Sequence, residues 1–89
     1  MANEKIRMVV ENEYSPSENR NIPAKILFSA IKVCNNTTYK FTICEFGNGE
    51  RRLIIERFAT RRLPRGFVSA PPAPLLGYVK KLKEAYGIE

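Results

Sequence analysis

The clearest pattern of apolar and polar positions lies in the middle of the chain. Residues 38–46 and 51–59 are two runs rich in β-branched and aromatic side chains, and a glycine-containing turn separates them. The pair Asn48-Gly49 is typical of a type I′ turn, because both central positions of that turn need a positive φ. The pattern therefore predicts an antiparallel hairpin.

A two-residue turn would place Gly47 opposite Glu50, and this choice fixes every other pair in the hairpin. Lys40 then lies directly opposite Arg57, and two like charges in that position destabilise a sheet unless an anion lies nearby. The same face carries Phe46, which is the aromatic side chain that we expect to be exposed. This face is the first indication of an anionic partner.

Residues 21–36 are predicted to form a helix. Asn21 can cap it and Pro23 lies near the first turn, where its missing N–H costs nothing. Four polar residues recur every three or four positions and form a narrow stripe: Lys25, Ser29, Lys32 and Asn36. The stripe favours the helix, but apolar residues within 24–33 also come close to alternation. A strand there stays open as the alternative, and it would give four strands and a C-terminal helix.

The remaining segments are shorter or less regular. Residues 5–11 alternate and predict a half-buried strand, whereas residues 15–20 are polar and predict a flexible loop. Residues 63–74 form a Pro-rich connector, and residues 74–86 carry apolar side chains at helical spacing, followed by Gly87 as a C-cap. The last segment is predicted to be an amphipathic helix.

These elements predict one α+β domain spanning residues 1–89, in the order β-α-β-β-α. The helices would cover one face of a small, mostly antiparallel sheet. A sheet with open edges and a broadly apolar helix also makes a homodimer possible. No apolar run is long enough to span a membrane and no signal peptide is recognisable, so a cytoplasmic protein is the default expectation.

Composition argues against catalysis. The 89 residues include no histidine and no aspartate, so the usual proton donors and acceptors near neutral pH are missing. Cys34 and Cys44 have no histidine to activate them and are best interpreted as reduced, apolar thiols. Two thiols without histidine also supply too few ligands for a structural zinc site within one chain. We therefore expect no enzyme activity, no metal and no cofactor.

The positive charge is concentrated in the second half of the chain. The net charge is +6, and six of the eight arginines lie between residues 51 and 65. Guanidinium groups match phosphate geometry and stay charged, so clustered arginines suit nucleic acid. A small basic protein that contacts the phosphate backbone of DNA or RNA is the first hypothesis. Its predicted binding residues are Lys40, Phe46, Arg51, Arg57, Arg61, Arg62 and Arg65.

The second hypothesis is a non-enzymatic interaction module or inhibitor, of the kind found among viral and mobile-element proteins. It would dock on an acidic protein surface of the machinery that handles nucleic acid. Phe67, which follows the arginines, fits either hypothesis as a contact residue and is equally compatible with a place in the core. The sequence does not distinguish DNA from RNA, or single from double strands.

Overall fold

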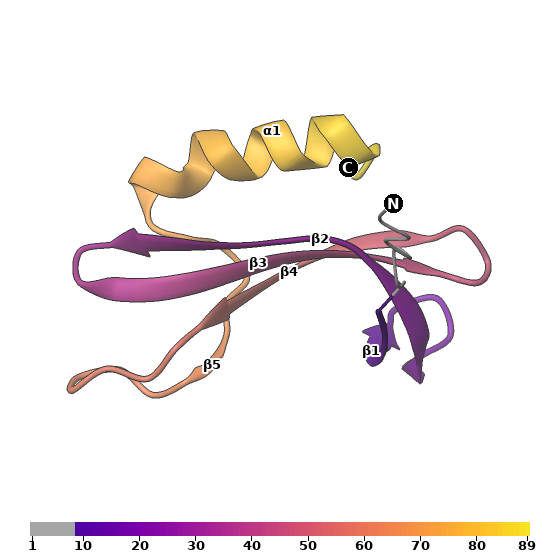
Figure 1. The fold of residues 1–89 in the computed structure, drawn as a ribbon, viewed down its shortest axis with the longest axis horizontal. Helices are drawn as coiled ribbons and strands as arrows, with labels where there is room; N and C mark the ends of the chain where they lie inside the picture. Colours follow the sequence, from indigo (N-terminus) through magenta and orange to yellow (C-terminus); the bar gives the residue numbers. More distant parts are fainter. Residues whose placement is uncertain (1–8) are drawn as a thin grey trace, which may run out of the picture.

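Within residues 9–89, five antiparallel strands form one curled sheet, and a single α-helix crosses one of its faces (Figure 1). The computed structural model describes residues 9–89. Neighbouring strands in the sheet follow chain order: β1 (Val10–Ser15), β2 (Arg20–Cys34), β3 (Thr37–Phe46), β4 (Arg51–Arg57) and β5 (Gly66–Phe67). A 3-10 turn, η1 (Ala73–Leu75), leads into α1 (Leu76–Tyr86). The sheet is a half-barrel, with β1 and β5 curling away from α1.

The predicted α+β class is confirmed, but the order β-α-β-β-α is wrong. Residues 21–36 do not form a helix, because they belong mainly to the 15-residue strand β2. The strand weighed as the alternative is therefore the correct interpretation. Most of the strand predicted over residues 5–11 lies outside the described residues, although its last two positions belong to β1.

A β-bulge explains why β2 resembles a helix in the sequence. Ile26 pairs with Cys44 but Phe28 pairs with Ile43, so Leu27 is an extra residue in the ladder. A bulge shifts the side-chain alternation by one position. Ile26 consequently packs on the face away from α1, whereas Phe28 packs toward α1 against Tyr86.

The turn between β2 and β3 also differs from its predicted role. Asn35 and Asn36 were expected to end a helix, but both have positive φ values, 52° and 62°. They join Cys34 to its partner Thr37 as a two-residue hairpin turn. Asparagine tolerates this left-handed conformation, which is typical of type I′ turns.

The β3–β4 hairpin is confirmed, but its predicted register is wrong by one residue. Phe46 donates its amide to the Glu50 carbonyl over 2.8 Å, which leaves a three-residue loop at 47–49. Gly49 takes a positive φ of 89°, whereas Asn48 does not and uses its side chain to accept the Glu50 amide. A three-residue loop with a left-handed last residue is a common alternative to the two-residue turn.

The corrected register removes the predicted like-charge pair. Lys40 lies opposite Glu56, and Arg57 lies opposite Tyr39. Because cross-strand partners share a face, Lys40 and Arg57 lie on different faces of the sheet. The pair therefore supplies no argument for an anionic partner.

Two cores stabilise the sheet, one on each face. The first lies under α1, where Phe41, Ile43 and Ile55 of the sheet pack against Val79 and Leu82 of the helix. The burial of Val79 and Leu82 confirms the predicted amphipathic helix, which ends at Gly87 with a φ of 70°. No helix in residues 9–89 is long and apolar enough to cross a membrane.

The second core fills the curl on the opposite face. It consists of Ala24, Cys44, Phe46 and Ile54, with Ile22 and Ile26 packed against them. Among residues 9–89, only the end of the sheet near the β3–β4 turn has this second layer of apolar contacts. In the part of the chain that the structure describes, no helix covers the rest of that face (Figure 1).

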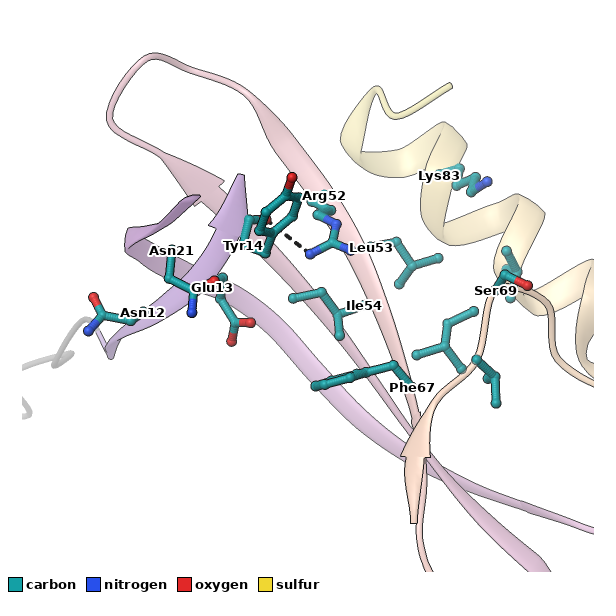
Figure 2. A pocket seen from close by; sticks show the side chains of 13 residues that line it. Asn12, Glu13, Tyr14, Asn21, Arg52, Leu53, Ile54, Phe67, Ser69 and Lys83 are labelled. Carbon is teal, nitrogen blue, oxygen red and sulfur yellow. Dashed lines mark hydrogen bonds between the residues drawn. The ribbon is translucent and has the colours of Figure 1, made fainter. Parts of the chain in front are cut away.

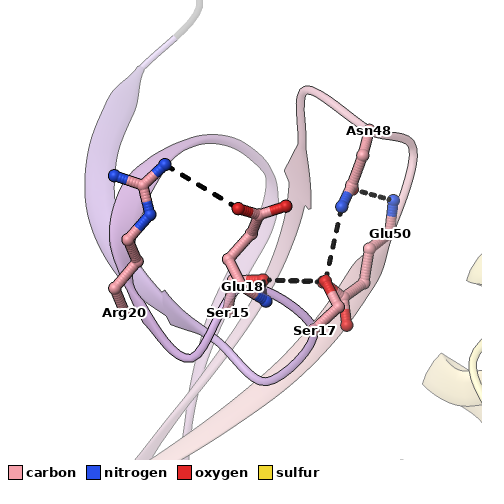
Figure 3. Close-up of polar contacts among 6 residues, drawn as sticks. All are labelled: Ser15, Ser17, Glu18, Arg20, Asn48 and Glu50. Atoms are coloured by element: carbon pink, nitrogen blue, oxygen red, sulfur yellow. Dashed lines mark hydrogen bonds and ion pairs between the residues drawn. The ribbon is translucent and has the colours of Figure 1, made fainter.

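Hydrogen bonds join the β1–β2 turn to the β3–β4 turn (Figure 3). The Ser15 and Ser17 hydroxyls donate to the Glu50 carboxylate over 2.9 and 2.8 Å, and Asn48 donates to Ser17. The segment predicted as a loop at 15–20 is a turn whose first and last residues belong to β1 and β2. These bonds hold the curl of the sheet closed at this end.

The two free thiols should differ in reactivity. Burial raises the pKa of Cys44 to about 11, with a smaller contribution from the nearby Glu13 carboxylate. Because only the thiolate is nucleophilic, iodoacetamide at pH 8 should alkylate the partly exposed Cys34 and leave Cys44 unmodified in the folded protein. Peptide mass spectrometry measures this, and both thiols should react in guanidinium. Equal labelling of both in the folded protein would contradict the burial of Cys44.

Candidate nucleic-acid interface

The sheet face opposite α1 carries exposed apolar side chains. Alternate residues of β3 pack under α1, so Lys40 and Thr42 between them point the other way. Their cross-strand neighbours share this face, which we call the open face: Ile31, Val33, Lys40, Thr42, Glu56 and Phe67. Phe67, Val33 and Ile31 are 74%, 67% and 58% exposed.

The predicted binding residues do not gather on one face. Arg51 and Arg57 lie on the side of α1, because their partners on β3 are Glu45 and Tyr39. Phe46 was expected to be exposed and is only 2% exposed, since the curl of β1 and β2 buries it in the second core. Of the hairpin residues predicted to bind, Lys40 and Phe46 lie on the face opposite α1, and of these two only Lys40 is accessible to solvent.

Three of the predicted arginines are engaged within the protein. Arg51 donates to the Glu45 carboxylate over 2.9 Å and to the Tyr86 carbonyl over 3.0 Å. Arg57 donates to the Pro64 carbonyl over 3.1 Å. Arg65 donates to Glu56 over 2.7 Å, although its side chain stays largely exposed. Arg51 and Arg57 therefore position the helix and the β4–β5 loop.

Arg61 and Arg62 are available to a ligand. Both are exposed on the β4–β5 loop, and no hydrogen bond or ion pair engages either guanidinium within residues 9–89. Thr60 shapes the loop by accepting the amides of Arg62 and Leu63 on its hydroxyl. We call Arg61, Arg62 and Arg65 the basic loop. It borders a cavity of about 750 Å³ that reaches Asn35 and Asn36.

A second cavity, of about 460 Å³, runs across β4 between β1 and β5 and reaches Val79 and Lys83 of α1. We call it the β1–β5 groove, and Figure 2 shows the side chains that line it, among them Glu13, Tyr14, Arg52, Ile54 and Phe67. Arg52 donates to the Tyr14 carbonyl over 3.0 Å and its guanidinium lies 5.9 Å from the Tyr14 ring centre. β1 is thereby tied to β4 beside the groove.

The groove contains one carboxylate in an unusual environment. Burial raises the pKa of Glu13, Glu11 raises it further, and the nearby Arg52 guanidinium lowers it. The carboxylate is thus partly withdrawn from water and lies close to an apolar surface formed by Ile54 and Phe67.

Sequence reasoning missed Glu13, Tyr14 and Arg52 as members of one site. These three residues lie close together because the sheet curls and brings β1 near β4, although β1 and β4 share no backbone hydrogen-bond ladder. For Phe67 the sequence left a contact role and a place in the core open, and its exposed ring excludes the core. The sequence feature that pointed to Phe67 was its position directly after the clustered arginines.

No cluster of metal-binding side chains occurs in the described part of the chain. Comparison with protein-family models, curated proteins and solved structures finds no match. The functional interpretation therefore depends on the geometry of this surface alone.

Proposed function

We propose that the protein binds single-stranded nucleic acid on its open face. The observation that carries this proposal is the exposed ring of Phe67, placed next to a loop whose Arg61 and Arg62 guanidinium groups have no partner in residues 9–89. Single-strand binders typically combine cationic side chains that follow the phosphates with aromatic rings on which bases stack. Both parts lie within β4, β5 and the loop between them.

An exposed ring favours a single strand over a duplex. In a duplex the faces of the bases already stack on each other, so a ring can reach them only after unstacking. The open face also presents strands rather than a helix, and α1 lies on the opposite side (Figure 1). A strand of nucleic acid following the basic loop toward the β1–β5 groove would meet Phe67 on the way.

The proposal predicts how strongly binding depends on salt concentration. Contacts from Arg61, Arg62 and Arg65 to three phosphates would give a slope of about −2 for log affinity against log salt. Arg65 can contribute because its guanidinium remains exposed beside Glu56. A much flatter slope would mean that phosphates are not bound by the basic loop.

Phe67→Ala tests the proposal. Loss of one stacked base should weaken binding to a fluorescein-labelled single strand by about 5- to 150-fold in fluorescence anisotropy. Thermal stability should hardly change, because the ring is exposed. Phe67→Tyr keeps the stacking surface and should bind normally, and Leu76→Ala, at an exposed apolar position on α1, should have no effect. Unchanged affinity of Phe67→Ala would contradict stacking on this ring.

A protein partner is the second candidate, and exposed side chains on β2 favour it. Ile31 and Val33 are exposed on the part of β2 that extends past its pairing with β1. Within residues 9–89, β2 has no strand beside it beyond Ile26, so a partner strand or a second copy of the chain could pair there. Such binding would depend on these apolar side chains and would survive charge reversal at Arg61 and Arg62.

A further inference from the structure

The β1–β5 groove has the size and chemistry of a pocket for one small planar group. Its volume of about 460 Å³ falls within the range of small-molecule sites. Buried Ile54 lies at its base, and the Glu13 carboxylate and the Phe67 ring point into it from opposite sides (Figure 2). An apolar base, one aromatic face and one acceptor-only group suit a nucleobase, and the lining also includes hydrogen-bond donors, among them Arg52, Ser69 and Lys83.

The hydrogen-bonding capacity of the groove discriminates among bases. An ionised carboxylate accepts hydrogen bonds through both oxygens and donates none. Guanine presents two adjacent donors on its Watson–Crick edge, N1–H and N2–H, which match two carboxylate oxygens. Adenine and cytosine place one amino donor beside a ring nitrogen that is an acceptor. Thymine and uracil place one N3–H between two carbonyl oxygens, which would repel the carboxylate.

We propose that the β1–β5 groove selects guanine from a bound single strand, stacking it against Phe67 and accepting its N1–H and N2–H on Glu13. This inference rests on the proposed function and adds a base preference to it. Asn12 and Asn21 also line the groove, so their amide groups are within the same cavity as the base. Arg52 donates one of its five guanidinium N–H groups to the Tyr14 carbonyl, and the proposal assigns it no contact with the base.

Partial burial of Glu13 strengthens this discrimination. A hydrogen bond shielded from water is electrostatically stronger, and an acceptor left unpaired there is more costly. The same burial raises the pKa of Glu13. As pH falls through that raised pKa, protonation removes one acceptor, and the guanine preference should fade at a higher pH than for an ordinary glutamate.

The test compares oligothymidylates of about nine nucleotides that carry one central guanine, hypoxanthine or thymine. Anisotropy should show about tenfold tighter binding for guanine than for thymine, as expected for one good bidentate contact. Hypoxanthine keeps N1–H but lacks the amino group, so its affinity should be intermediate. This comparison uses the unaltered protein and does not depend on how a variant folds.

Glu13→Gln should reduce the guanine-to-thymine ratio to near one, because an amide offers a donor as well as an acceptor. Glu11→Gln makes the same change of charge on the same strand, outside the groove, and should keep the ratio. Equal binding of all three oligonucleotides by the unaltered protein would overturn guanine selection and leave single-strand binding intact. Failure to bind any of them at low salt would overturn both.

Discussion

Replacing Phe41 with alanine is expected to lower the free energy of unfolding by about 3–5 kcal/mol. Phe41 is completely buried in the first core, between β3 and α1. Its ring centre lies 5.1 Å from that of Tyr78 in an edge-to-face arrangement. Truncation removes this contact and leaves a cavity that α1 can close only by shifting on the sheet.

Urea unfolding followed by far-UV circular dichroism measures this loss. Phe67→Ala is the matched control, because it makes the same chemical change at a 74% exposed position. We expect it to cost no more than about 0.5 kcal/mol. Similar losses for the two variants would contradict the assignment of Phe41 to the core and Phe67 to the surface.

Reversing the charge of Arg61 and Arg62 together is expected to reduce affinity for a single strand by at least about 25-fold at 0.1 M salt. Two lost phosphate contacts reduce the slope of log affinity against log salt by about 1.4, which corresponds to that factor at 0.1 M. Repulsion between the new carboxylates and phosphate adds to the loss. The fold should be unaffected, since both side chains are exposed.

The matched control is Lys80→Glu with Lys81→Glu, which makes the same total change of charge at exposed positions on α1. Anisotropy titrations at several salt concentrations should show a smaller loss and an almost unchanged slope. Equal losses for the two double variants would mean that only net charge matters, and that the basic loop is not a specific contact.

Local signals in the sequence predicted the elements with simple periodicity. The hairpin and α1 follow from strand-forming runs, a glycine turn and apolar residues at helical spacing. A helix was preferred to the strand alternative in β2 because the bulge at Leu27 interrupts the alternation, so polar residues recur every three or four positions as they do on a helix. Asn35-Asn36 suits both a helix end and a hairpin turn, and only pairing across β2 and β3 decides between them.

The candidate site was harder to predict because it depends on a one-residue register and on the curl of the sheet. A loop of three residues instead of two moved Arg57 to the face of α1 and placed Lys40 opposite Glu56. The curl buried Phe46, which sequence pattern alone would leave at the surface of a flat hairpin. The exposure of Arg61 and Arg62 depends on neither the register nor the curl, because both residues lie on a loop.

Chemical-shift mapping of the ¹⁵N-labelled protein with an unlabelled single strand tests nucleic-acid binding on the open face most directly. We expect the largest amide shifts at Arg61, Arg62 and Phe67, with further shifts on β1 beside the groove. The amides of Lys80 and Lys81 on the opposite side should remain unchanged. No shifts at low salt would contradict nucleic-acid binding, and shifts confined to α1 would contradict its placement on the open face.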